Sequence, residues 1–344
     1  MLTMNHADKA VLRLTVGLGL AVLVAYGFAF PTPFVVCLMS ILMLCKPGPP
    51  LPPIKGLVIA VIFATLVASG VLMVPILEHY ALSGILLTGA ILYGVFFMGL
   101  ASANPLTMVL VIAFAVIPVV GVADQAIAGA LSMTLALGIL IGALVSSASK
   151  ALFPDPPTRA AGRPVSALAS HETARWIALR ATVIVMPVFV LALTNPSFYV
   201  ATIMKTVALS QQAGDIDARS AGSELVGSTL MGALIAAVVW CGLSLHPSLW
   251  MLMLWMMGAA LWTGSGIFGT RSTSFRPSFW SNALITMVIL LGPAIEDSAS
   301  GKSVFEASIV RTGLFVAVAF YAWGTVRVLE RWRQRRPGLG TEHV

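Results

Sequence analysis

Long apolar runs alternate with short polar segments along the whole chain. About 20 apolar residues are enough for a helix to cross the roughly 30 Å hydrocarbon core of a bilayer. Runs of this kind, interrupted by Pro, Gly and charged residues, predict twelve helical spans: 10–30, 33–46, 56–77, 81–100, 104–122, 126–150, 173–194, 196–211, 223–243, 247–267, 277–293 and 303–328. Three of them, 33–46, 196–211 and 277–293, are short for a full crossing. The pattern predicts an all-α integral membrane protein with about twelve transmembrane helices.

Composition agrees with this fold class. Hydrophobic residues make up 58% of the 344 residues and charged residues only 10%, and the mean hydropathy is +0.96. A soluble domain carries about 25% charged residues, so a water-soluble protein is excluded. Cys37, Cys45 and Cys241 lie in apolar stretches with no CxxC motif or nearby His. The sequence therefore predicts neither a disulfide framework nor a metal site, and no cofactor.

Basic residues follow the topology of a membrane protein. If the N-terminus is inside, all Lys and Arg residues fall on the inner side except Lys205, Lys302 and Arg311. The outer loops instead hold the acidic residues Glu78, Asp124, Glu296 and Asp297. Positive charge is retained on the cytoplasmic side of membrane proteins, so we expect both termini to be cytoplasmic. The net charge of +7 then reflects topology, and nucleic acid is not an expected partner.

The chain also repeats itself loosely. Arg13 opens a span that ends in Pro31-Thr32-Pro33-Phe34, and Arg180 opens one that ends in Asn195-Pro196-Ser197-Phe198. We predict two six-helix halves, 8–152 and 173–330, joined by a cytoplasmic linker at 153–172 and followed by a basic cytoplasmic tail at 331–344. Because each half holds an even number of spans, the repeats lie parallel in the membrane. Parallel repeats are a common design of transporters.

These features resemble one family of membrane proteins. An Arg opens each half, a span ends in Pro and Phe, a short helix follows, and then a Gly-rich helix that contains Gly227-Ser228-Thr229-Leu230-Met231-Gly232. Together they resemble the fusaric-acid-resistance and aromatic-acid-exporter superfamily of bacterial inner-membrane efflux proteins. Larger members carry cytoplasmic domains after each half, which this chain lacks. The family also tends to place an Arg just before the Gly-rich helix, where this chain has Glu224, with Arg219 five residues earlier.

The resemblance implies a function and partners. It implies proton-driven export of small aromatic or amphipathic carboxylic acids from the bacterial cell across its inner membrane, often with a periplasmic adaptor protein. Plant malate channels look like distant relatives. An organic-anion channel, or a membrane subunit of a larger efflux complex, is therefore the alternative. The sequence leaves open whether the protein forms a homo-oligomer.

Charged residues inside the spans are the first site candidates, because a buried charge in a membrane is costly and usually faces a cavity or a partner. Lys205 lies near the middle of 196–211, and Arg311 lies eight residues into the last span. With Arg180 they are the predicted substrate-binding cations, which suit a carboxylate ligand. The alternatives are a lysine that reaches the inner surface along its aliphatic stem and a structural pair of Arg311 with Glu306 or with another helix.

Three acidic residues are the candidates for proton coupling. Glu306 lies at the edge of the last span near Arg311. Asp124 and Asp297 match across the repeat, just beyond Pro118 and Pro293. The alternative for Glu306 is an ordinary acid at the outer edge. For the two aspartates it is a position at a helix start, where a carboxylate is stabilising.

Aromatic residues supply the last candidates. Trp255, Gly258 and Trp262 recur at spacings of three and four, so they share a helix face, and an aromatic ligand could stack there. Packing against lipid is the alternative. The sequence contains no GxxxxGK[ST], HExxH or GxSxG motif, so we expect neither ATP hydrolysis nor another enzyme activity.

Overall fold

The computed structural model describes residues 5–45, 53–102, 107–154, 171–214, 220–301 and 304–335. Within these ranges the protein is all-helical, with thirteen helices and no strand. Lys46, Arg219, Lys302, most of the linker at 153–172 and the end of the tail lie outside the described residues.

The helices follow the twelve predicted segments. The first seven are α1 (His6–Gly27), α2 (Pro33–Leu44), α3 (Pro53–Val71), α4 (Met73–His79), α5 (Ala81–Ser102), α6 (Thr107–Ala123) and α7 (Gln125–Leu152). The other six are α8 (His171–Thr194), α9 (Pro196–Gly214), α10 (Ala221–Leu245), α11 (Leu249–Ile267), α12 (Pro277–Ala299) and α13 (Val304–Gln334).

Prolines explain several of the boundaries. Pro33 and Pro277 occupy the first turn of their helices, where a missing N–H costs no hydrogen bond. Pro75 divides the third predicted segment into α3 and α4. Its ring clashes with the carbonyl four residues earlier, which is that of Val71, the last residue of α3.

The predicted end of the eleventh segment at residue 293 is wrong. Helix α12 continues through Pro293 to Ala299, because Ala294 and Asp297 remain buried against other helices and tertiary packing offsets the hydrogen bond that proline removes. Asp297 therefore lies in the last turn of a helix and not at a helix start.

The protein is a multi-pass membrane protein by the length and composition of its helices. Eight of the described helices are long and apolar enough to cross a bilayer: α1, α5, α7, α8, α10, α11, α12 and α13. Large apolar side chains such as Leu82, Leu234 and Trp250 are exposed on their outer surfaces. A band of this kind is what contact with lipid requires.

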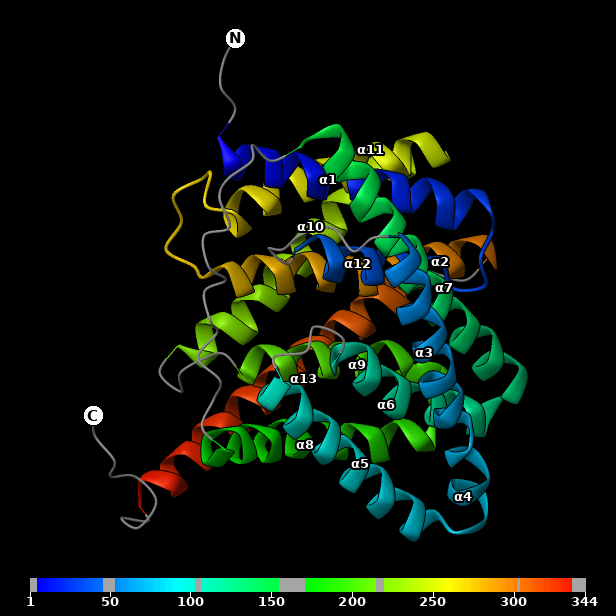
Figure 1. Cartoon of the computed structure of the whole chain (residues 1–344), viewed down its shortest axis with the longest axis vertical. Helices are drawn as coiled ribbons and strands as arrows, with labels where there is room; N and C mark the ends of the chain where they lie inside the picture. Colours follow the sequence, from blue (N-terminus) through cyan, green and yellow to red (C-terminus); the bar gives the residue numbers. More distant parts are fainter. Residues whose placement is uncertain are drawn as a thin grey trace.

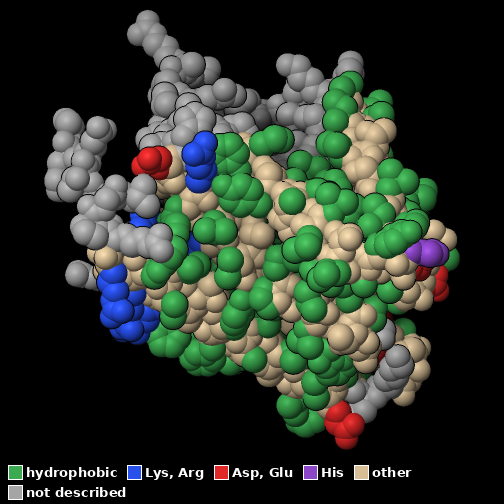
Figure 2. All heavy atoms as spheres, turned by 90° about the horizontal axis from the view of Figure 1, so that it is seen from below, with side chains coloured by type: hydrophobic (Ala, Val, Ile, Leu, Met, Phe, Trp, Pro, Cys, Tyr) green, Lys and Arg blue, Asp and Glu red, His purple; other side chains and the backbone are tan. Residues whose placement is uncertain are grey.

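Charge separates the two ends of the helix bundle. In Figure 1, α1 begins and α13 ends at the left of the view, so both ends of the described chain lie on one side. Figure 2 shows Lys and Arg side chains gathered toward that end with an acidic side chain beside them, hydrophobic side chains across the middle, and His and further acidic side chains toward the opposite end. The chain thus has a basic end and an acidic end, with an apolar region between them.

Helices of the two predicted halves pack in matching ways. In residues 5–154, α7 contacts α1, α2, α3 and α6; in residues 171–335, α13 contacts α8, α9, α10 and α12. Between the halves, α1 packs along α11 and α5 packs along α8, and Figure 1 shows α1 beside α11 at the top and α5 beside α8 below. The helices α1–α7 and α8–α13 are therefore interlocked and do not form two separate bundles.

Candidate functional site

Lys205 lies at the centre of the second half. It is nine residues after Pro196, about 13 Å along α9, and its side chain is fully buried. The position nine residues after Pro33, in the matching helix α2, is Leu42. The lysine therefore belongs to one half only.

Helix α12 supplies the direct partners of Lys205. The ammonium nitrogen Nζ donates to Thr286 Oγ1 at 2.7 Å and to Asn282 Oδ1 at 3.4 Å. Thr286 in turn donates to the carbonyl of Asn282 at 2.5 Å. Asn282 and Thr286 are four residues apart, so they lie on one face of α12 and present two oxygens to the lysine.

The hydrogen bonds continue from α12 to α10 and back to α9. The amide Nδ2 of Asn282 donates to Ser228 Oγ at 2.7 Å, and Ser228 Oγ lies 3.4 Å from Gln212 Oε1. Gln212 Nε2 donates to the carbonyl of Glu224 at 3.4 Å. We call Lys205, Gln212, Ser228, Asn282 and Thr286 the buried polar network. All five residues are buried. The network begins at Lys205 in the middle of α9 and reaches the carbonyl of Glu224 in the first turn of α10.

A close helix contact brings these side chains together. A Cβ atom at Gly232 would lie 2.5 Å from Thr286 Cβ and 2.6 Å from the carbonyl oxygen of Ala283. Only glycine allows α10 and α12 to approach this closely, as small residues do at helix interfaces in membranes. Gly232 belongs to the Gly-rich segment 227–232 that the sequence singled out.

Within the described residues, no carboxylate forms an ion pair with the buried amine of Lys205. The two ion pairs found in the described residues are Arg180–Glu330 and Arg311–Asp297, and neither involves Lys205. Moving an ammonium group from water to a protein interior costs several kcal/mol, which hydrogen bonds to neutral groups only partly offset. A small anion that reached Lys205 would supply the missing charge.

A second polar site lies at the acidic end of the bundle. A cavity of about 270 Å³ is bordered by α2, α6 and α7 of the first half and by α9, α12 and α13 of the second. Its wall is mostly apolar, with Phe34, Phe198 and Met204 among its residues, and its charged side chains are Glu296, Asp297 and Arg311. We call it the outer cavity.

Arg311 is paired at the outer cavity. Its Nη2 atom lies 2.6 Å from Asp297 Oδ2. Nη1 of Arg311 and Oγ1 of Thr32 are buried and make no hydrogen bond within the described residues. The structure thus gives Arg311 a partner other than Glu306, because α12 and α13 are antiparallel neighbours and bring residue 297 opposite 311.

The two deep cations, Lys205 and Arg311, lie at different sites. Arg311 borders the outer cavity, whereas Lys205 is not one of its lining residues. Ala201, which lines the cavity, is four residues before Lys205 and so shares its face of α9. The buried polar network therefore lies farther along the interface of α9 and α12 that borders the outer cavity.

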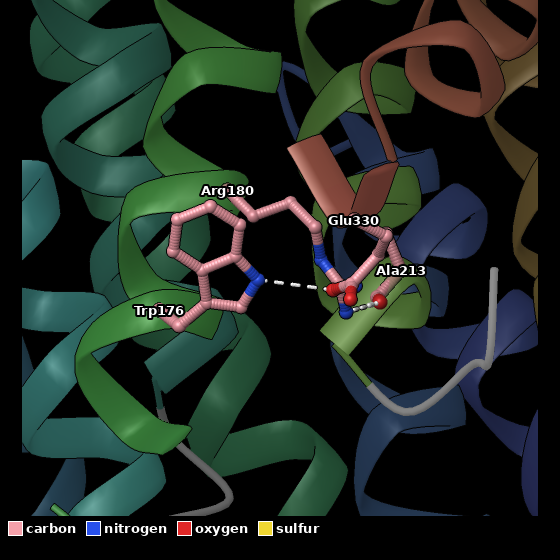
Figure 3. A network of polar contacts seen from close by, with 4 residues as sticks. All are labelled: Trp176, Arg180, Ala213 and Glu330. Atoms are coloured by element: carbon pink, nitrogen blue, oxygen red, sulfur yellow. Dashed lines mark hydrogen bonds and ion pairs between the residues drawn. The ribbon is translucent and has the colours of Figure 1, made fainter. Parts of the chain in front are cut away.

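Arg180 joins three helices near the basic end. Its guanidinium lies 3.0 Å from Glu330 Oε1 on α13 and donates to the carbonyl of Ala213 at the end of α9. Trp176 Nε1 donates to the same carboxylate oxygen at 2.9 Å, as Figure 3 shows. Arg180 is buried, and these contacts fix α8, α9 and α13 together.

The two tryptophans of α11 lie apart from both sites. Trp255 packs on Gly242 of α10, where a Cβ atom would lie 2.0 Å from the indole ring. Trp262 is 41% exposed; its ring meets Trp280 edge-on at 5.0 Å, and the Arg271 guanidinium lies 4.5 Å from its centroid. Neither ring borders the outer cavity.

The three predicted proton-coupling acids have different surroundings. Asp124 caps α7: its Oδ1 accepts from the N–H groups of Ala126 and Ile127 at 2.8 and 3.3 Å. Glu306 is exposed in the first turn of α13. Asp297 is the one that is buried and paired with a cation.

Sequence reasoning missed four members of the buried polar network: Gln212, Ser228, Asn282 and Thr286. Two polar residues four apart in an otherwise apolar span were the available signal, since such residues in a membrane helix usually face a partner. It also missed Glu296, because that position reads as an ordinary loop acid when the helix is assumed to end at Pro293.

The Asp297–Arg311 pair should behave as a coupled unit in unfolding. In a double-mutant cycle of Asp297→Asn and Arg311→Gln, we expect a coupling energy of about 1–2 kcal/mol, because both side chains are mostly buried and in direct contact. Chemical unfolding of the protein in detergent measures it.

A matched cycle with Glu306→Gln and Arg311→Gln should give no coupling, because Glu306 is exposed and makes no ion pair in the described structure. Equal coupling in both cycles would contradict the pairing.

Comparison with known proteins adds no assignment. The chain matches no model of a known protein family, no curated protein and no solved structure.

Proposed function

We propose that this protein is a secondary transporter that exports small organic anions across a bacterial inner membrane. The observation that carries the proposal is Lys205, a fully buried lysine whose described hydrogen-bond partners, Asn282 and Thr286, are uncharged. A charge that is retained inside a membrane bundle at a cost in stability is typical of a substrate or ion pathway.

The packing supports a transporter of two parallel six-helix repeats. The contacts of α7 within the first half correspond to those of α13 within the second. In the proposed repeat α1 corresponds to α8 and α5 to α11, so the α1–α11 and α5–α8 contacts are equivalent. A pseudo-two-fold axis along the membrane normal produces such a pattern. On this proposal twelve segments span the membrane, with α3 and α4 together forming one span, and the basic end is cytoplasmic.

The outer cavity supports a route for the substrate. It lies between the halves, where transporters built of repeats place their sites, and its apolar wall suits the ring of an aromatic acid. Lys205 would hold the carboxylate farther along the interface of α9 and α12 that borders this cavity. Asp297, the buried carboxylate paired with Arg311, is the best placed of the three acids to exchange a proton during coupling.

The proposal includes a periplasmic adaptor protein that binds the acidic end of the bundle. Glu78, Asp124 and Glu296 are exposed there, and the resemblance to aromatic-acid exporters suggests a periplasmic partner on this face. Single ion pairs at such an exposed surface are weak, so the contact would need several of them.

Counterflow in proteoliposomes tests the function. We expect a labelled aromatic carboxylate to accumulate in vesicles that contain the protein and an imposed proton gradient, and a protonophore to abolish the accumulation. The uncharged amide of the same ring should not compete, because it offers Lys205 no negative charge.

Two results would count against this function. Equal competition by the amide would contradict an anion site. Carboxylate current that survives collapse of the proton gradient would indicate an anion channel.

A further inference from the structure

A large cavity at the basic end contains no residue of the buried polar network in its lining. It has a volume of about 660 Å³ and lies between the first turns of α10 and the last turns of α13. Gly222 and Val226 line it from α10; Trp323, Arg327 and Arg331 line it from α13. We call it the inner groove.

Side chains along α13 change from apolar to basic within this groove. Phe320, Trp323, Arg327 and Arg331 are spaced by three, four and four residues, so they form one stripe on the helix. The Arg327 guanidinium lies 5.5 Å from the centre of the Trp323 ring. The stripe thus offers an aromatic surface toward the middle of the bundle and two guanidinium groups toward its end.

The positive charge of the inner groove is not neutralised within the described structure. Arg327 and Arg331 are exposed and take part in neither of its ion pairs. The one carboxylate of the lining, Glu330, is already bound by Arg180 at 3.0 Å and by Trp176 at 2.9 Å. The groove is therefore suited to an anion.

The start of α10 strengthens this preference. A Cβ atom at Gly222 would lie 2.9 Å from Trp323 Nε1, so the first turn of α10 lies directly against the aromatic part of the stripe. This places the N-terminus of α10 in the same groove as Arg327 and Arg331, and helix N-termini favour anions such as phosphate.

The depth of the groove indicates which kind of phosphate. In α13 the apolar sequence ends near Val326, and Arg327, Arg331 and Arg333 follow within two turns. This transition marks the membrane surface, where lipid headgroups lie, and Trp is enriched at that level. Phe320 and Val226 extend the groove toward the apolar region, where an acyl chain would lie.

We propose that the inner groove binds one anionic phospholipid, with the phosphate held by Arg327 and Arg331 and the acyl chain against Phe320 and Val226. A headgroup in this position would contact α10 and α13 at once, next to the Arg180–Glu330 contact that joins α8, α9 and α13. The site is separate from the buried polar network and does not depend on which anion the protein transports.

Native mass spectrometry of the purified full-length protein in a nonionic detergent tests this site. Titration with phosphatidylglycerol should give one tight-binding lipid, and phosphatidylcholine should bind far more weakly. In the variant Arg327→Gln/Arg331→Gln we expect the dissociation constant for phosphatidylglycerol to rise about 30-fold, because each basic group at a membrane surface contributes about fivefold.

Arg335→Gln is the matched control, because it removes a positive charge from the same end of α13 without touching the groove; its dissociation constant should stay within about twofold of the parent value. An equal loss in both variants, or no loss in the double variant, would overturn the proposal. Release of the lipid by inorganic phosphate alone would also overturn it, since that would assign the groove to a free anion.

Discussion

Lys205→Met should abolish anion transport and leave the protein as stable as the parent chain or more so. A buried charge is costly, and replacing buried charged groups by apolar side chains of similar volume is often neutral or stabilising by about 1–4 kcal/mol. Methionine has nearly the length of lysine and fits a fully buried position. It offers a carboxylate no positive charge, so carboxylate counterflow should fall by at least about tenfold, the equivalent of a lost charge-assisted hydrogen bond.

The opposite directions of the two effects make this experiment decisive. Unfolding in detergent measures the stability, and carboxylate counterflow in proteoliposomes measures the transport. Ser210→Ala is the matched control on the same helix: Ser210 is buried but hydrogen-bonds only to the Val207 carbonyl of its own helix, so transport should be unchanged. Normal transport by Lys205→Met would remove Lys205 from the substrate pathway.

Gly232→Ala should destabilise the protein by about 1–3 kcal/mol, the usual effect of forcing an extra carbon into a packed interface. The new Cβ would lie 2.6 Å from the backbone carbonyl of Ala283, which cannot rotate away. Helices α10 and α12 must then separate, and the separation would lengthen the hydrogen bond from Asn282 to Ser228. Transport should therefore fall together with stability.

Gly258→Ala supplies the control with the same chemical change. Gly258 also lies inside a helix, α11, but no atom lies within 4 Å of its added Cβ. Alanine is favoured over glycine in a helix by about 0.5–1 kcal/mol, so this variant should be slightly more stable than the parent. If both variants shifted stability in the same direction, the close contact at Gly232 would not control the packing of α10 on α12.

Helix positions were predictable because each apolar segment is bounded by residues that cannot continue it. Pro33, Pro196 and Pro277 begin helices where the sequence indicated. Pro293 misled the prediction, since a proline within a buried helix can be tolerated when neighbouring helices cover the site. Whether a proline ends a helix or lies within it depends on tertiary contacts, and periodicity does not report them.

The candidate site was only partly predictable for a similar reason. The depth of Lys205 follows from its distance to Pro196 along one helix. Its partners Asn282 and Thr286 are more than 75 positions away in sequence and meet it because α9 and α12 pack against each other. For Arg311 the sequence left two structural partners open, Glu306 or another helix, and the structure pairs it with Asp297 of the neighbouring antiparallel helix.

The interlocking of α1 with α11 and of α5 with α8 limits how the molecule can move. One helix of each half packs along a helix of the other half at both contacts. Tilting one half as a rigid body would therefore disrupt the α1–α11 and α5–α8 interfaces at once. A smaller displacement is available in α9, because this one helix lines the outer cavity through Met204 and carries Lys205 of the buried polar network. For the transporter proposed above, we expect a shift of α9 within the interlocked frame to change both sites at once.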